Sequence, residues 1–518
     1  LGTDKQGIFT LFVDRDNDIW MYSPLGIWVY NPEQEKWLSW LTNIIKRRSH
    51  NMVRAVSQDK QGRIWIGTDQ DGIDILDKKT GEVRQLRNKT GDERSLQNNT
   101  VMVLYEDSSE TMWVGTYKKG ISYFNECAFK FGAEYIGDIS CIEEDKEGYV
   151  WLGTNDVGII YWNSVTGNRA AFPQKGMDKL TTDAIVCILK AGDGKLWIGT
   201  FGGGLICYDN GRIIHYKKNI PERQNSLAHN NVLALAEDKQ GIIWIGTLGG
   251  GVQSLNPKTG LFTTYNTTSA GLISDYVSSL CMGKEGSLWI GTAQGLSELD
   301  IETKKVVNLE GTKSGKEYFS DQNISQVYED SRGLIWIGTC EGLNVYNPKT
   351  DELIILGVEQ GVSSPIISGI VEDGNENIWV TTARGITNVI PAVDLKTGRY
   401  IFHSCVYDDK DGLQNSGFNL RSIKKLSSGE ILMGGLYGIN RFRPDDIKYN
   451  KKRPSVMFTR LFLFNEEVGV GEEYEGRVIL DKALNKVDQI KLSYEQNMFS
   501  VQFASDNYIL PEKTEYAY

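Results

Sequence analysis

The stretch Asp238-Lys239-Gln240-Gly241-Ile242-Ile243-Trp244-Ile245-Gly246-Thr247 decides the fold, because close copies of it recur along the chain. The pattern is Asp, two variable residues, Gly, and then an apolar run centred on Trp that ends in Gly-Thr. Clean copies stand at 59–68 and 330–339, and in a last copy Leu432 occupies the tryptophan position. The tryptophans of the other copies are Trp20, Trp65, Trp113, Trp151, Trp197, Trp244, Trp289, Trp336 and Trp379. Such recurrence indicates a repeat protein.

The spacing of the copies identifies the repeat unit. It runs from 38 residues (Trp113 to Trp151) to 53 residues (Trp379 to Leu432), and a period of roughly 40–50 residues is typical of a four-stranded propeller blade. In D-x-x-G the Asp and Gly favour a hairpin turn, so we interpret these carboxylates as turn formers rather than catalytic acids. The Trp ring is large enough to fill the gap between adjacent blades. We therefore predict an all-β protein made of propeller blades.

The domain boundaries follow from counting. Ten copies exceed the four to eight blades of a typical ring. The shortest spacing places a junction near 125–135, with three copies before it and seven after it. We predict a partial N-terminal β-propeller of three blades at 1–128 and a seven-bladed β-propeller at 129–448. Three blades expose a lateral edge, so we expect the natural protein to continue upstream with about four more blades.

A different pattern begins after the last copy. Residues 450–454 read as a polar linker, and alternating apolar stretches follow at 456–464, 489–492 and 499–503. These stretches predict strands, and we interpret 455–518 as the start of an Ig-like β-sandwich that the sequence cuts short.

Composition excludes several classes of function. The net charge is −11 and the Lys and Arg residues are scattered, which argues against nucleic acid as a partner. Seven cysteines without a CxxC pair argue against a disulfide framework. The four histidines lie far apart and show no metal-ligand spacing. We predict no catalytic residue, no metal and no cofactor in this region.

One face of the seven-bladed ring is the predicted ligand site. Successive strands alternate in direction, so the loops between strands two and three share a face with the loops that lead into each innermost strand. Amides, an aromatic ring, an acid and an arginine around a central depression would suit a sugar. The candidate ligand-binding residues are Asn155, Phe201, Asn231, Gln294, Asn323, Glu341, Arg384, Asn419 and Tyr437.

The chain resembles the periplasmic sensor region of hybrid two-component systems that respond to glycan breakdown products. Those proteins combine two-component regulator propeller repeats with a triple-tyrosine Ig-like domain. The resemblance rests on the 238–247 repeat, on a last blade at 412–419 and 434–440, and on the stretch 497–518. Departures follow Trp20 and Trp379, where Met21-Tyr22-Ser23 and Val380-Thr381-Thr382 replace the usual residues.

The resemblance implies a function for the whole protein. It implies a membrane-anchored sensor histidine kinase that binds glycan-derived oligosaccharides and signals to polysaccharide-utilisation genes. It also implies a homodimer, a periplasmic location, and a transmembrane helix downstream of this chain.

Two alternatives remain open. A propeller-type carbohydrate-active enzyme, either a glycoside hydrolase or a lyase, would show turnover. A hydrolase needs two carboxyl groups about 5–10 Å apart, and the loop acids come from different blades without an obvious pair. A protein-interaction scaffold would bind no small glycan.

Overall fold

The computed structural model describes residues 9–23, 26–48, 52–90, 95–128, 130–163, 166–173, 180, 182, 184–218, 225–414, 417–449, 455–509, 511–514 and 516. Close contacts divide the chain into two units, Phe129–Ile447 and a second unit made of Leu1–Ala128 and Lys448–Tyr518. Strands dominate both units. Within the described ranges, no helix combines the length and the apolar character needed to cross a membrane.

Seven four-stranded antiparallel sheets make up the unit 129–447. Six are formed by consecutive strands, each with its first strand innermost. They are β13 (Ile139–Glu144), β14 (Tyr149–Thr154), β15 (Ile159–Asn163) and β16 (Arg169–Phe172); β17 (Ile185–Lys190), β18 (Leu196–Thr200), β19 (Leu205–Asp209) and β20 (Arg212–Tyr216); β21 (Val232–Glu237), β22 (Ile243–Thr247), β23 (Val252–Asn256) and β24 (Leu261–Tyr265); β25 (Val277–Met282), β26 (Ser287–Thr292), β27 (Gly295–Asp300) and β28 (Val306–Leu309); β29 (Ile324–Glu329), β30 (Ile335–Thr339), β31 (Leu343–Asn347) and β32 (Glu352–Leu356); and β33 (Ile367–Glu372), β34 (Ile378–Thr382), β35 (Gly385–Val393) and β36 (Tyr400–Tyr407). The seventh joins β37 (Phe418–Lys425), β38 (Ile431–Gly435) and β39 (Gly438–Phe442) to β12 (Gly132–Tyr135).

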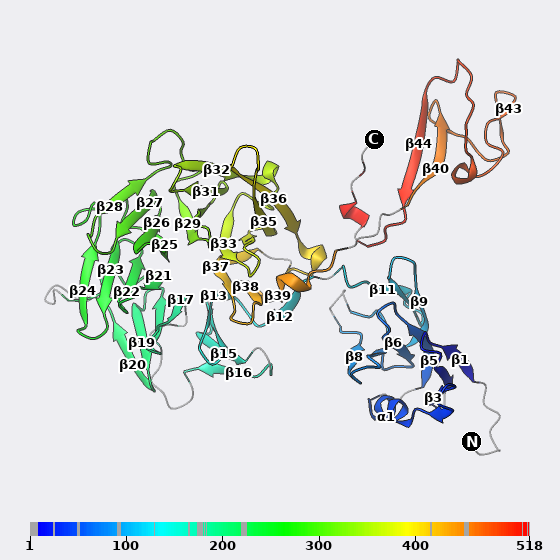
Figure 1. Ribbon diagram of the computed structural model, residues 1–518, viewed down its shortest axis with the longest axis horizontal. Coiled ribbons are helices and arrows are strands. Elements are labelled where there is room, and N and C mark those ends of the chain that lie inside the picture. The colour runs from blue at the N-terminus through cyan, green and yellow to red at the C-terminus, as the bar shows by residue number, and fades with distance from the viewer. Residues whose placement is uncertain are drawn as a thin grey trace. The chain divides into compact units, whose positions relative to one another are not determined.

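The ring is closed by a strand from its own beginning. β12 pairs antiparallel with β39, with Tyr135 opposite Gly438, and so completes the last blade. The innermost strands contact one another in order, and β37 contacts β13 to close the circle. Figure 1 shows the sheets from β13 to β39 arranged around this centre. The predicted seven-bladed propeller is confirmed, whereas the closing strand was not foreseen.

The Asp and Trp of each clean copy are joined by a hydrogen bond. In the turn between β29 and β30, one carboxylate oxygen of Asp330 accepts the backbone N–H groups of Arg332 (2.9 Å) and Leu334 (3.0 Å). The other accepts the indole N–H of Trp336 at 2.9 Å. The same Asp–indole bond joins Asp14 to Trp20, Asp59 to Trp65, Asp107 to Trp113, Asp145 to Trp151, Asp238 to Trp244 and Asp373 to Trp379. The Asp therefore stabilises the turn and also accepts the hydrogen bond of the buried indole N–H.

The tryptophans pack between blades, as predicted. Trp197 of β18 is 1% exposed and contacts Val232 and Ile243 of the following blade. Burying an indole removes some 150–250 Å² from water, so these rings make a large share of the core.

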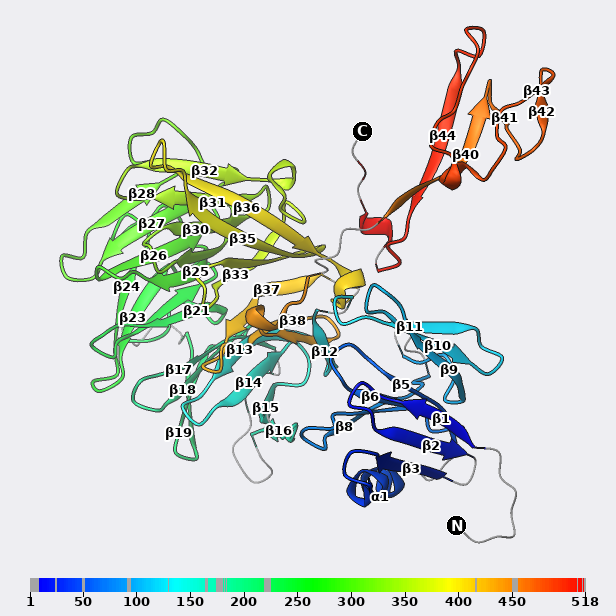
Figure 2. The same cartoon turned by 45° about the vertical axis from the view of Figure 1, so that its right-hand side comes forward.

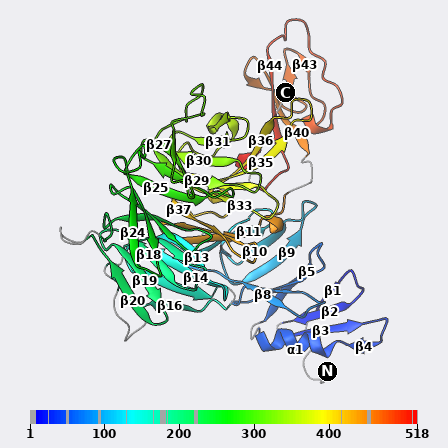
Figure 3. The ribbon, with the colours of Figure 1, turned by 60° about the vertical axis from the view of Figure 1, so that its left-hand side comes forward.

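Three sheets precede the ring. They are β1 (Thr10–Val13), β2 (Ile19–Ser23), β3 (Gly26–Asn31) and β4 (Lys36–Trp37); β5 (Val53–Gln58), β6 (Ile64–Thr68), β7 (Ile73–Leu76) and β8 (Val83–Leu86); and β9 (Val101–Glu106), β10 (Met112–Thr116) and β11 (Ile121–Phe124). Figure 3 shows their strands beside one another. The third sheet has three strands rather than the expected four. Val103, Tyr105 and Ile121 in this sheet are exposed, and the proposed upstream blades stay a prediction.

An α-helix not foreseen from the sequence follows the first sheet. α1 (Ser39–Arg48) lies beside β3, as Figure 2 shows. Its Leu41 is fully buried against Val29 in the core of the first blade. Apolar packing therefore holds this insertion to the blade.

The segment after the ring forms a small separate sheet. β40 (Val456–Leu463) pairs antiparallel with β44 (Phe499–Ser505) and with β41 (Glu466–Glu467), and β42 (Glu473–Tyr474) pairs with β43 (Arg477–Val478). The strand predicted at 489–492 is wrong. Ile490 and Leu492 instead pack as irregular chain against the core of this segment. An Ig-like sandwich stays a prediction. Short 3-10 helices complete the fold at Val358–Gln360, Asp409–Asp411, Pro444–Asp446, Leu484–Lys486 and Pro511–Lys513.

Candidate functional site

The loops that lead into the innermost strands and the turns after the second strands lie on one face of the ring. Backbone hydrogen bonds join the two sets. The N–H groups of Asn155, Phe201, Leu248, Ala293 and Ala383 donate to the carbonyls of Asp138, Ala184, Asn231, Tyr276 and Ile366. We call the surface that these loops and turns form the mouth face. The strand order therefore brings residues from distant stretches of the chain to one surface.

All nine predicted site residues belong to segments of the mouth face, and two of them share one carboxylate. The side-chain N–H groups of Asn155 and Asn419 both donate to the carboxylate of Asp138, at 2.8 and 2.6 Å. Asn419 also donates to the carbonyl of Ile139 at 2.8 Å. These two amides and Asp138 form a network where the last blade meets the first. Part of their hydrogen-bonding capacity is thus used inside the protein.

A second predicted pair shares one turn. The side-chain oxygen of Asn231 accepts the N–H of Gly202 at 2.7 Å and fixes the turn that carries Phe201. The Phe201 ring is 55% exposed. Asn231 is therefore a positioning residue for an aromatic surface.

The remaining candidate residues do not share a partner with one another in the described part of the chain. The backbone N–H groups of Gln294, Glu341 and Arg384 each donate to the threonine hydroxyl of their own turn at 3.1 Å, and their side chains are exposed. The N–H of Asn323 donates to Asp321 at 3.1 Å, and Tyr437 is 53% exposed.

Sequence reasoning missed apolar members of the mouth face. Tyr276, Ile366 and Leu436 are large exposed side chains there. Tyr276 and Ile366 stand immediately before β25 and β33, at the positions equivalent to Asn231. The amide of Asn231 suggests polar contacts, whereas an apolar residue at the same position carries no such chemical signal. Their position in the repeat was the available signal.

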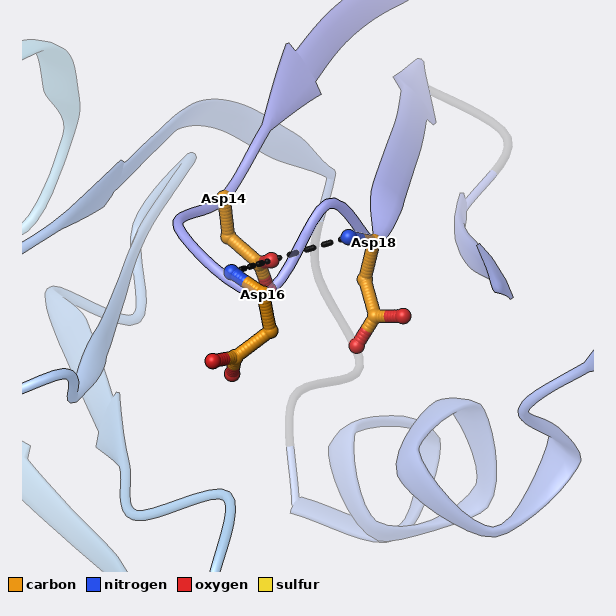
Figure 4. A group of neighbouring side chains, drawn as sticks. All are labelled: Asp14, Asp16 and Asp18. Carbon is orange, nitrogen blue, oxygen red and sulfur yellow. Dashed lines mark hydrogen bonds between the residues drawn. The ribbon is translucent and has the colours of Figure 1, made fainter. Parts of the chain in front are cut away.

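Three acids near the N-terminus have the arrangement of metal ligands. Asp14, Asp16 and Asp18 lie around the turn between β1 and β2, and their carboxylates come within 4.8 Å of one another (Figure 4). The ammonium of Lys78 is 2.7 Å from each of them. Burial alone would lower the pKa of Lys78, but its bonds to the three aspartates hold that pKa above its ordinary value. This cluster already contains its cation.

A cavity of about 240 Å³ lies in the unit 1–128 with 448–518. Four of its charged lining groups pair with one another. Arg63 contacts Glu126 at 2.5 Å and Asp59 at 2.7 Å, and Lys448 also pairs with Glu126. Ile509 also lines the cavity. The residue before it, Tyr508, packs edge-on against the ring of Trp113. The cavity thus gathers segments that attach the chain after the ring to the third blade.

Comparison with known proteins identifies the repeat. The model of the two-component regulator propeller matches residues 48–70, 95–118, 136–156, 179–202, 226–249, 271–294 and 318–341. The chain carries two-component regulator propeller repeats. Two of the matched repeats precede the ring and five lie in it. The copies centred on Trp20 and Trp379, which depart from the pattern, are outside the matched segments.

Three relatives extend the comparison. A histidine kinase named P4 from Formosa agariphila is 26% identical over 337 residues, which are 64% of this chain and 24% of that protein. A solved structure from B. thetaiotaomicron, described as the extracellular domain of a hybrid two-component system, matches with a TM-score of 0.73 at 24% identity, covering 97% of this chain and 64% of that one. A second such domain from B. thetaiotaomicron matches with a TM-score of 0.50 at 20% identity, covering 97% and 67%. The chain therefore spans about a quarter of the curated kinase.

Proposed function

We propose that this chain is the extracytoplasmic ligand-sensing region of a membrane-anchored hybrid two-component sensor histidine kinase. The observation that carries the proposal is the set of seven two-component regulator repeats, five of which lie in the closed ring of seven sheets. The name of the curated relative and the descriptions of the similar extracellular domains support it. A periplasmic location and a downstream transmembrane helix belong to the same proposal.

The proposed ligand is an oligosaccharide derived from glycan breakdown. Sugars present apolar ring faces and a belt of hydroxyl groups, so they bind where aromatic surfaces stand among amides and charged groups. Phe201, Tyr276 and Tyr437 offer exposed rings on the mouth face. Gln294, Glu341 and Arg384 offer exposed polar groups among them. Binding there would signal to polysaccharide-utilisation genes.

The signal would leave through the segment after the ring. Lys448 pairs with Glu126, and Tyr508 packs on Trp113 with ring centroids 5.7 Å apart. These contacts link the C-terminal sheet to the third N-terminal blade. A ligand that binds two arrangements of a homodimer unequally would shift the balance between them, whereas equal affinity would move nothing.

A thermal-shift screen against neutral and acidic oligosaccharides tests the proposal. A ligand at 100 times its dissociation constant should add about 2.7 kcal/mol of apparent stability. A saturable rise in the melting temperature with at least one glycan is the expected result. Release of new reducing ends or of unsaturated products would instead favour the carbohydrate-active enzyme. No shift with any glycan would favour the protein-interaction scaffold.

A pair of matched variants tests whether the ligand binds on the mouth face. Phe201→Ala removes an exposed ring from the mouth face, and Leu395→Ala removes a 98% exposed side chain from the turn between β35 and β36, on the opposite face. We expect only the first to weaken glycan binding, by about 5- to 30-fold for a contact worth 1–2 kcal/mol. Equal effects of the two variants would place the ligand elsewhere.

A further inference from the structure

The last blade has an unusual innermost strand. In the first six blades this strand carries one extra residue near its beginning, as between Ile139 and Cys141. In β37, Phe418 is opposite Gly435 and Ile423 is opposite Met433, so residues 419–422 stand against the single Gly434. β37 also approaches β29, which belongs to a blade that is not its neighbour. The bulge therefore projects toward the centre of the ring.

Arg421 stands within this bulge with a left-handed backbone, at φ of 60°. Such a conformation is uncommon for a residue other than Gly, and residues of this kind cluster at functional sites. The Arg421 guanidinium donates to the backbone carbonyl of Ser278 on β25, three blades away around the ring. The side chain thus reaches across the centre of the ring.

The positive charge of Arg421 lacks a counter-charge in the part of the chain that the structure describes. No described carboxylate lies within ion-pair distance, and the Asp138 carboxylate on the same face is held by two amides. The titratable groups that act on Arg421 are the thiols of Cys187 and Cys141. Burial raises the pKa of Cys187 to about 12 and that of Cys141 higher still, so both are neutral at pH 7.

Burial also lowers the pKa of Arg421 from its ordinary value. An arginine nevertheless stays charged in proteins. A partly buried cation without a counter-charge is unfavourable, because the protein gives up hydration without gaining an ion pair. Arg421 follows Asn419 of the mouth face by two residues, and its partner Ser278 follows the exposed Tyr276 by two residues.

We propose that Arg421 is the anion-binding residue of the mouth face and that the ligand is an acidic oligosaccharide, whose carboxylate or sulfate group completes the ion pair. The inference rests on the proposed function and deepens it, because it names the chemical class of the sugar. A guanidinium presents paired N–H donors that match either group. The aromatic rings of Phe201 and Tyr276 would contact the sugar to which the acid is attached.

Titration calorimetry with matched sugars and variants tests the proposal. The probes are trigalacturonate and its neutral counterpart galactotriose, and a sulfated carrageenan disaccharide with its desulfated form. We expect an acidic probe to bind the wild type and Arg421→Gln to weaken it about 10- to 100-fold, the size of a charge-assisted hydrogen bond. Arg421→Lys should lose less, and the control Arg399→Gln, whose exposed side chain pairs with Glu352, should lose nothing. The two acidic probes distinguish a carboxylate ligand from a sulfate ligand.

Stability separates binding from a structural role. Since Arg421 lacks a counter-charge, Arg421→Gln should melt at the same temperature as the wild type or higher. Sodium sulfate stabilises proteins generally, so the readout is the difference between variants. Sulfate should raise the melting temperature of the wild type more than that of Arg421→Gln, relative to sodium chloride of equal ionic strength.

The outcomes are distinct. If the neutral probes bind and Arg421→Gln does not change their affinity, this inference is overturned, but the proposed sensor function stands. If no sugar binds, the proposed glycan ligand is wrong. The effect of sulfate on the melting temperatures of wild type and Arg421→Gln then decides whether Arg421 binds anions. A lower melting temperature for Arg421→Gln, equal in sulfate and chloride, would make Arg421 a structural residue and overturn the inference.

Discussion

The carboxylate of Asp330 accepts the indole N–H of Trp336 at 2.9 Å, and both side chains have no exposed surface. This bond connects the hairpin turn on one face of the blade to the ring that packs against the next blade. Turn formation and blade packing therefore depend on one side chain.

Asp330→Ala should be strongly destabilising. It leaves the indole N–H of Trp336 buried without its acceptor and removes the partner of Arg332, which pairs with Asp330 at 2.9 Å. We expect a loss of about 3 kcal/mol from the stability of the ring, seen by calorimetry as a lower melting temperature. Asp330→Asn, which keeps the shape and one acceptor, should lose less. A melting temperature unchanged in Asp330→Ala would contradict the role given to this bond.

Ala191→Asp should stabilise the ring. Ala191 occupies the Asp position of the second blade, and its N–H donates to Lys195 at 2.9 Å as in the other turns. The indole N–H of Trp197 is buried without an acceptor among the described residues. An aspartate at 191 would supply the missing acceptor, and we expect about 1 kcal/mol of added stability, measured as a higher melting temperature.

Gly283→Asp is the matched control for that substitution. Gly283 also replaces the Asp, but Glu329 of the next blade already accepts the indole N–H of Trp289 at 3.3 Å. A Cβ at 283 would lie 2.6 Å from the Ser287 hydroxyl and 3.1 Å from Glu329. This variant should be neutral or destabilising. Equal stabilisation by both substitutions would show that the indole bond is not the cause.

Lys78→Ala should destabilise the N-terminal blades. The carboxylates of Asp14 and Asp18 are nearly fully buried, and both would lose the ammonium that neutralises them. We expect a loss of about 3 kcal/mol, whereas the exposed neighbour variant Lys79→Ala should change little. The emptied cluster would offer three oxygen ligands to a hard cation, so millimolar Ca²⁺ should recover part of the loss. Identical melting of the two variants would refute this account.

The pH dependence of the same cluster has a defined sign. The hydrogen bond from Lys78 holds the pKa of Asp16 below its ordinary 3.8, so this contribution is present above pH 3.8 and lost as the pH falls below it. The raised pKa of Lys78 makes its contribution complete below its ordinary 10.5 and lost as the pH rises beyond that value. The melting-temperature difference between wild type and Lys78→Ala should be flat between about pH 5 and 9. A steady change of this difference between about pH 5 and 9 would show that groups other than Asp16 and Lys78 cause it.

The repeat was predictable from the sequence because its signals are local. An Asp and a Gly at fixed distances form a turn, and an apolar run with Trp must be buried. The seven-bladed count followed from spacing alone. The strand predicted at 489–492 failed because Ile490 and Leu492 are apolar but pack without a strand partner. Apolar character alone does not distinguish a strand from a buried irregular segment.

The site was only partly predictable, because it depends on pairing between distant strands. The shared face followed from strand direction, which placed Phe201 and Tyr437 on it. The network of Asn155 and Asn419 around Asp138 joins residues 281 positions apart and depends on closure by β12. Arg421 carries no motif, and its place near the centre of the ring results from a bulge that only the register of β37 reveals.

The most direct test of the central claim is a crystal structure of this chain with the oligosaccharide that raises its melting temperature most. We expect the sugar on the mouth face of the seven-bladed ring, with an acidic group paired to Arg421 and a sugar ring against Phe201 or Tyr276. A sugar bound on the face of the D-x-x-G turns, or on residues 9–128 with the mouth face unoccupied, would contradict it.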